Sequence, residues 1–224
     1  MPIPKNKKEL LKKMYILFDQ QASSWDIACH RYCSDCCTDR IWMTTLEGSL
    51  IKDYIQSNNM QYLLKKMNAI SVKDRHHPKT TMNLEAILSV QDKPIPVPEN
   101  KIISNICPFL TDNECPIYSV RPMACRSMVS SLSCHEKGFA EMSHISMSIS
   151  TVFSQYIEHI DNNGFYGNFM NVLTLLTTSK EIMPIQYVMA QELLLNNQVI
   201  KYLMVPPEHR LMIQPIIEKI HAMA

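Results

Sequence analysis

Apolar residues recur at helical spacing from the start of the chain. Leu10, Met14, Leu17 and Phe18 fall on one face of the stretch 5–20, and lysines occupy the opposite face. Residues that repeat every three or four positions form one stripe on a helix and alternate with a solvated side. The pattern therefore predicts an amphipathic helix over residues 5–20.

The same spacing predicts helices along most of the remaining chain. Thr44 and Glu47 have the residue types and the separation of a capping box, which marks the start of a second helix. The further predicted helices are 61–67, 84–90, 142–160, 168–178, 184–197 and a last one that Pro206 and Pro207 open and Pro215 kinks. The segment DNNGFYGN around Gly164 and Gly167 reads as a turn between helices. We expect a mainly α fold.

Two polar, turn-rich stretches interrupt this helical pattern. The first, residues 29–37, reads CHRYCSDCC, and the second, residues 107–126, reads CPFLTDNECPIYSVRPMACR. Three prolines in residues 91–101 force extended backbone before the second stretch, and residues 101–106 have the composition of a short strand. We expect a loop-rich knuckle or hairpin. The predicted division is a cysteine-cluster domain over residues 1–138 and a helical extension over 139–224 that packs on it.

Composition narrows the classes of function. With 22 basic and 21 acidic residues the formal charge is +1, whereas nucleic-acid binding requires a basic face. No apolar run approaches the roughly 18 residues that span a bilayer, and lysines interrupt the apolar positions of the N-terminal stretch where a signal peptide has a continuous apolar core. Only four glycines are present, and no glycine-rich phosphate loop occurs. We expect a cytoplasmic protein that binds neither nucleic acid nor membrane.

The eight cysteines carry the chemistry of the sequence. Disulfides are rare in a reducing cytosol, so metal binding or redox chemistry explains these thiols better. Thiolates are soft ligands that suit zinc and iron–sulfur clusters. Short spacings let neighbouring thiolates face one centre, and a remote segment then completes it. The candidate metal ligands are Cys29, Cys33, Cys36, Cys37, Cys107, Cys115, Cys125 and Cys134.

The number of metal centres stays open at this point. Eight thiols suffice for two four-cysteine sites, or for one site with other thiols nearby. Cys36 and Cys37 are adjacent, so their side chains point in different directions and do not easily share one zinc ion. His30 and His135 each follow a cysteine, but the thiols alone already saturate a site. A [4Fe–4S] cluster is favoured narrowly over zinc.

The two cysteine stretches resemble a family of zinc- or iron-chelating proteins whose hallmark is CxxCxxCC. That family continues with a C-x-I-Y-x-x-R-P-x-x-C-R stretch. The matching positions here are Cys115, Ile117, Tyr118, Arg121, Pro122, Cys125 and Arg126. The resemblance covers roughly residues 25–130 and implies metal chelation. The chain differs from the hallmark in having three residues between Cys29 and Cys33. One similar branch, the flagellin lysine methylases, implies methyl transfer from S-adenosylmethionine.

Arg121 and Arg126 are the candidate cofactor-binding residues. Several thiolates around one centre leave a net negative charge, which these flanking arginines would offset while donating hydrogen bonds to sulfur. Tyr118 is interpreted as a packing residue.

Three other interpretations explain the cysteines less well. Inert buried thiols do not gather into two short polar segments. A radical S-adenosylmethionine enzyme fits the spacing Cys29-x3-Cys33-x2-Cys36, but Asp35 stands where an aromatic residue is usual. A zinc ribbon requires two C-x2-C knuckles, whereas only the first cysteine stretch of this chain has such short spacing. We therefore predict a cysteine-liganded metal protein with a structural, redox or accessory role and with room for a protein partner. The alternative is a methyltransferase that uses S-adenosylmethionine and carries a cluster.

Overall fold

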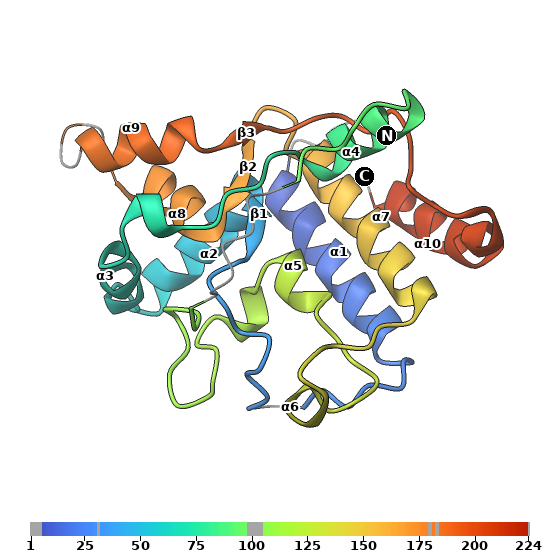
Figure 1. The fold of residues 1–224 in the computed structure, drawn as a ribbon, viewed down its shortest axis with the longest axis horizontal. Helices are drawn as coiled ribbons and strands as arrows, with labels where there is room; N and C mark the ends of the chain where they lie inside the picture. Colours follow the sequence, from blue (N-terminus) through green and yellow to red (C-terminus); the bar gives the residue numbers. More distant parts are fainter. Residues whose placement is uncertain (1–5, 31, 98–104, 179–180, 182–183, 224) are drawn as a thin grey trace.

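The computed structural model describes residues 6–30, 32–97, 105–178, 181 and 184–223. Helices dominate, which confirms the mainly α prediction (Figure 1). The α-helices are α1 (Lys7–Ala22), α2 (Thr45–Ser57), α3 (Tyr62–Asn68), α4 (Met82–Val90), α5 (Met123–Arg126), α6 (Cys134–Lys137), α7 (His144–Ile160), α8 (Phe169–Thr177), α9 (Pro184–Glu192) and α10 (Arg210–Ala222). Short 3-10 turns cover Val72–Asp74, Tyr118–Val120 and Pro207–His209. Pro215 lies inside α10, as expected.

A small antiparallel sheet was not predicted. Its strands are β1 (Trp42–Thr44), β2 (Phe165–Asn168) and β3 (Leu195–Asn196), and β2 lies in the middle. Trp42 pairs with Asn168, and Phe165 pairs with Asn196. The turn prediction for DNNGFYGN is therefore wrong in its second half, and the predicted helix 184–197 ends at Glu192. Strands β2 and β3 form because segments distant in sequence supply their hydrogen-bond partners, and such partners leave no local signal in the sequence.

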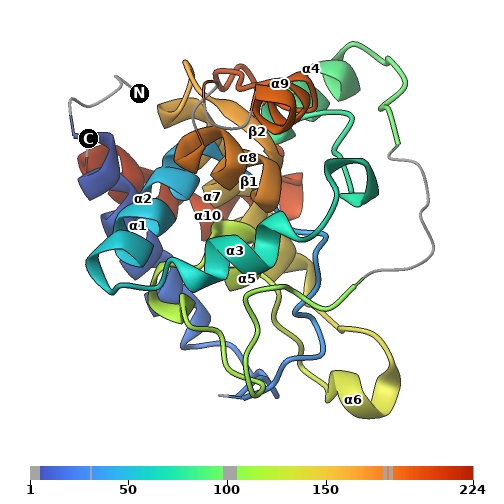
Figure 2. The same ribbon diagram turned by 90° about the vertical axis from the view of Figure 1, so that its left-hand side faces the viewer.

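Two apolar clusters form the core. The first joins α1, α7 and α10, with Phe18, Phe153 and Ile213 fully buried. The second lies between α2, α3 and α8 and also takes in Phe109 and Ile117 from the second cysteine stretch. Figure 2 shows α2, α8 and α3 stacked on this side. The first cluster contains residues from both sides of the predicted boundary at 138/139. The division into two domains stays a prediction.

Both cysteine stretches lie at one end of the molecule. In Figures 1 and 2 the loops that follow α1 and precede α5 extend to the end marked by α6. The predicted strand over 101–106 is described only from Asn105, and residues 101–104 lie outside the described residues. Ile106 makes an isolated antiparallel bridge to Thr38. In the described part of the chain, no helix combines the length and apolar character needed to cross a membrane.

Candidate metal centre

A short antiparallel contact joins the two cysteine stretches. The Cys107 N–H donates to the Cys37 carbonyl at 3.0 Å, and the Asp39 N–H donates to the Asn105 carbonyl at 3.0 Å. The bridge between Thr38 and Ile106 lies between these two bonds. The backbone itself therefore places Cys107 beside Cys37.

The Asp39 carboxylate reinforces this contact. Its Oδ1 accepts the Asn105 N–H at 3.1 Å, and its Oδ2 accepts the Asn105 side-chain amide at 2.8 Å. The Asp39 carbonyl also accepts a bond at 2.8 Å from the Asn168 side chain, which caps α8. Asp39 is only 3% exposed, so these bonds replace water that a buried carboxylate has lost.

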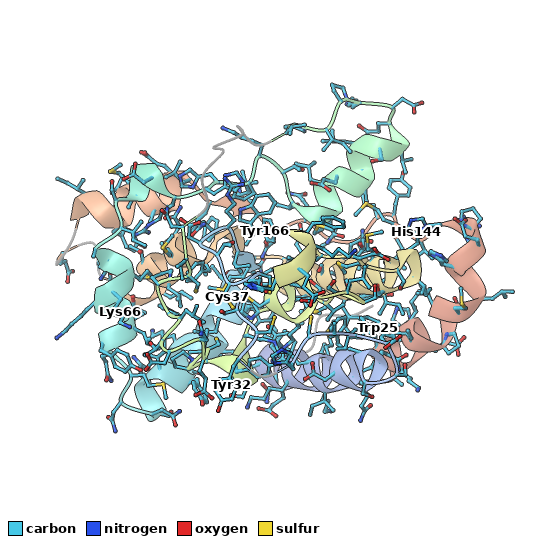
Figure 3. All side chains as sticks on the ribbon, turned by 60° about the horizontal axis from the view of Figure 1, so that its bottom comes forward. Trp25, Tyr32, Cys37, Lys66, His144 and Tyr166 are labelled. Carbon is cyan, nitrogen blue, oxygen red and sulfur yellow. The ribbon has the colours of Figure 1, made fainter. Side chains whose placement is uncertain are left out.

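Seven of the eight thiols line one cavity of about 400 Å³. They are Cys29, Cys33, Cys36, Cys37, Cys107, Cys115 and Cys125. The cavity's inner wall is apolar and includes Ile51, Phe109 and Phe169. Figure 3 looks onto this end of the molecule, with Cys37 near the middle of the view. All eight cysteines are partly buried and free of disulfides. The fold thus brings the two stretches to a shared space.

The thiols surround this cavity without closing on one point. Among the described residues, no three or more His, Cys, Asp or Glu side chains are arranged to hold a single metal ion. Cys134 is not part of the cavity lining. The arrangement therefore gathers soft ligands around a volume rather than around one ion position.

Cys107 and Cys115 each begin a tight turn whose backbone points at sulfur. The Cys107 thiol accepts hydrogen bonds from the N–H groups of Phe109 and Leu110, and Cys115 accepts one from Ile117. A proline follows each of these cysteines and holds the turn's dihedral angles. Backbone N–H donors favour the ionised form of the group that accepts them. Burial raises the pKa of both thiols, and these backbone donors offset part of that rise.

Burial acts in the opposite direction and is the largest influence on Cys107 and Cys125. It raises the pKa of Cys107 to about 11. Burial also raises the pKa of Cys125 strongly, and the neighbouring charges of Cys107, Cys115 and Cys36 raise it further. The Cys36 thiol donates a hydrogen bond to Cys37, and this bond raises the pKa of Cys36 more than burial does. Thiolates that oppose one another in this way need a bound cation to ionise together.

Cys29 lies against a different segment. The Ser130 N–H donates to its sulfur at 3.3 Å, and the Ala28 N–H donates to the Ser130 carbonyl at 2.8 Å. Burial raises the pKa of Cys29, and the charges of Cys33, Cys36 and Cys134 add to that rise. Cys134 is thus an electrostatic neighbour of Cys29, and Cys36 acts on Cys29 as well as on Cys125.

The two candidate arginines have different surroundings. Arg121 stacks on Tyr118, with its Cζ 3.6 Å from the ring centre, and its charge lowers the pKa of Cys115 and Cys125. Arg126 is buried, and its Nη1 donates to the Asp19 carboxylate at 2.6 Å. Its Nε donates to the Arg121 carbonyl at 3.0 Å. Both arginines line the cavity, and the charge of Arg121 offsets part of the rise that burial causes in the pKa of Cys115 and Cys125.

The two candidate histidines are near the site. His30 lines the cavity, whereas His135 Nδ1 lies 3.9 Å from the Asp35 carboxylate. Asp39 was not predicted as a residue of the site, because nothing in its local sequence distinguishes it from a surface carboxylate. Glu47 was predicted only as a helix cap, although this residue also contacts the turn that carries Cys125.

The thiol-lined cavity and its knuckles define a cysteine-rich metal-chelating domain. A family model named CxxCxxCC, described as a putative zinc- or iron-chelating domain, matches residues 28–146. This match covers more than half of the chain, which therefore belongs to the CxxCxxCC family, as the resemblance predicted. Comparisons with curated proteins and with solved structures found no match. The donor set, soft thiols that raise one another's pKa, suits the metals that the family description names.

Proposed function

We propose that the protein binds a [4Fe–4S] cluster through Cys36, Cys107, Cys115 and Cys125. One observation carries the proposal: Cys125 lines the thiol cavity together with Cys36, Cys107 and Cys115, and the charges of these three raise its pKa beyond the rise that burial causes. Two of the four lie on Cys-Pro knuckles whose N–H groups already point at sulfur. Hydrogen bonds to thiolate sulfurs are a means by which proteins tune such clusters.

The spacing of the thiols supports a cluster over a single zinc ion. Four thiolates on one zinc ion, at about 2.3 Å each in a tetrahedron, bring their sulfurs to roughly 3.8 Å from one another. No three candidate side chains in the described part of the chain have such an arrangement. In a cluster each cysteine binds a different iron, so the sulfurs stand farther apart around a larger centre. A cavity of about 400 Å³ lined by seven thiols suits that larger group.

The proposal places the other four cysteines around the cluster and not on it. They are Cys29, Cys33, Cys37 and Cys134. Cys29 and Cys33 line the same cavity, and Cys134 influences Cys29. Their role in the proposal is to take part in loading the centre. A cluster when bound supplies one-electron chemistry or a rigid cross-link, which gives the protein a redox, accessory or structural role. We also place the protein in the cytoplasm, where thiols stay reduced.

Anaerobic purification followed by iron, zinc and acid-labile sulfide analysis tests this proposal. We expect about four irons and four sulfides per chain and a brown protein. Cys125→Ser and Cys107→Ser should lose the iron, whereas Cys134→Ser, outside the cavity lining, should keep it. One zinc per chain without sulfide would overturn the cluster. Calorimetry of the loaded protein with S-adenosylmethionine tests the methyltransferase alternative, which stays a prediction.

A further inference from the structure

Both ends of the turn that carries Cys125 are held by carboxylates from other helices. This turn is α5, and it follows Pro122. At its start the Met123 N–H donates to the Glu47 carboxylate at 2.7 Å. At its end the Arg126 guanidinium donates to the Asp19 carboxylate at 2.6 Å. A single helical turn is too short to be stable by itself, so its position depends on these contacts.

Glu47 is a buried junction of three elements. Its Oε2 accepts the Thr44 N–H at 2.9 Å and the Thr44 hydroxyl at 3.1 Å, which completes the predicted capping box of α2. Its Oε1 accepts the Tyr15 hydroxyl of α1 at 2.9 Å, in addition to the Met123 N–H of α5. A capping box needs only one of these oxygens. The second oxygen is therefore available to hold α5.

The burial of Glu47 makes its contact with α5 important. Glu47 is only 3% exposed. Burial raises the pKa of its carboxyl group, and the hydrogen bonds that the carboxylate accepts offset part of this rise. The first N–H groups of a helix lack partners within the helix, and one left unpaired in a buried place costs free energy. The Met123 N–H and the Glu47 carboxylate are therefore hydrogen-bond partners in a buried place where water does not serve either group.

We propose that Glu47 is a positioning residue for Cys125. It fixes the start of α5 so that the Cys125 thiol faces the cavity before any metal binds, which reduces the conformational entropy lost on binding. Arg126 completes this role at the other end of α5, where its guanidinium also lies over the Tyr15 ring with its Cζ 4.1 Å from the ring centre. The inference rests on the proposed function, since it gives Cys125 a part in metal binding.

The chain contains a matched control for Glu47. Glu158 is 1% exposed and is also a buried carboxylate that accepts backbone N–H groups. Its Oε2 accepts the Asn83 N–H at 2.8 Å at the start of α4, and its Oε1 accepts the Gln198 N–H at 2.7 Å. It is not among the residues lining the thiol cavity. Glu47→Gln and Glu158→Gln each replace one acceptor oxygen by a donor, so both should destabilise the fold.

The alkylation rate of each cysteine in the reduced, metal-free protein tests the positioning. Iodoacetamide is the probe, and mass spectrometry follows Cys125 relative to Cys107 in the same molecules. In Glu47→Gln we expect this ratio of rates to rise about tenfold, the effect of one lost buried hydrogen bond. In Glu158→Gln it should stay unchanged, because global unfolding exposes both thiols equally. An unchanged ratio in Glu47→Gln would overturn the proposal.

A second variant, Glu47→Asp, tests the same proposal if the Glu47→Gln protein does not fold. Glu47→Asp keeps the charge at the start of α2 but is one methylene too short to reach both Thr44 and Met123. It should raise the same ratio, and a wild-type ratio in a folded Glu47→Asp protein would count against the positioning role. The loaded protein adds an independent signal, a changed electron paramagnetic resonance spectrum in the Glu47 variants only. Alkylation needs no metal, so it fails or succeeds separately from the iron and sulfide analysis.

Discussion

The Asp39 carboxylate holds Asn105 by two hydrogen bonds, at 3.1 Å from the backbone N–H and 2.8 Å from the side-chain amide. Each residue lies two positions from a cysteine, Cys37 in one stretch and Cys107 in the other. The pair therefore sets the register between the two halves of the candidate centre before any metal is present.

Asp39→Ala should separate the two cysteine stretches and weaken metal retention. The change removes two hydrogen bonds to Asn105, each worth about 0.5–1.5 kcal/mol in the free energy of unfolding. The rate of metal loss to a chelator measures the effect on the centre. Asp161→Ala is the control, because Asp161 is also buried and bonded to Thr45 and Leu46. A control that loses metal as fast as Asp39→Ala would contradict the specific role of Asp39.

The metal-free protein should lose stability in alkaline solution. Burial raises the pKa of Cys107 from 9.0 to about 11 in the folded protein. The unfolded chain therefore releases this proton first, so the free energy of unfolding is undiminished below pH 9 and falls as the pH rises toward 11. Urea unfolding across this range measures the slope. Cys107→Ser should show a shallower fall, and an equal slope in the two proteins would exclude Cys107 as its source.

Metal uptake should release protons and become tighter as the pH rises. Thiols bind metal only as thiolates, and burial keeps those of Cys107 and Cys125 protonated in the metal-free protein. Calorimetry in buffers with different ionisation enthalpies counts the protons released when Zn²⁺ is added as the probe. No proton release at neutral pH would mean that the thiols are already ionised, contrary to their burial.

Arg121→Met should make the loaded centre harder to reduce. Burial raises the pKa of Cys115 and Cys125, and the charge of Arg121 offsets part of that rise, so its loss removes positive charge beside these thiols. A reduction potential lower by tens of millivolts is the expected order of magnitude for a partly exposed charge. Redox titration measures it. Lys66→Met is the control, because Lys66 is a cation outside the cavity lining; an equal shift there would indicate a non-specific charge effect.

Phe109→Ala should loosen the second cysteine stretch from the core. Phe109 is fully buried and packs edge-on against Phe169 of α8, with ring centres 5.5 Å apart. Truncation of such a side chain typically costs about 3–5 kcal/mol. Thermal unfolding should show a lower Tm, and metal loss to a chelator should accelerate. Phe153→Ala, a fully buried change in the other apolar cluster, should lower Tm without accelerating metal loss from the folded protein.

The sequence by itself determined the longer helices, the capping box at Thr44 and Glu47, and the two cysteine stretches. These features depend on spacing within a few residues, where periodicity and cap geometry operate. The motif around Cys115 and Cys125 likewise sufficed to indicate the family, because its residues are contiguous.

Only the tertiary structure decided which of these residues act together. Strand β2 formed in place of the expected turn because β1 and β3, remote in sequence, pair with it. Arg121 and Arg126 looked alike in the motif, yet Arg126 is bonded to Asp19 of α1, while the charge of Arg121 acts on the thiols. Packing also brings Glu47 Oε1, which takes no part in the capping box, to the Met123 N–H. Hydrogen bonds between distant segments depend on packing in three dimensions, which local spacing does not encode.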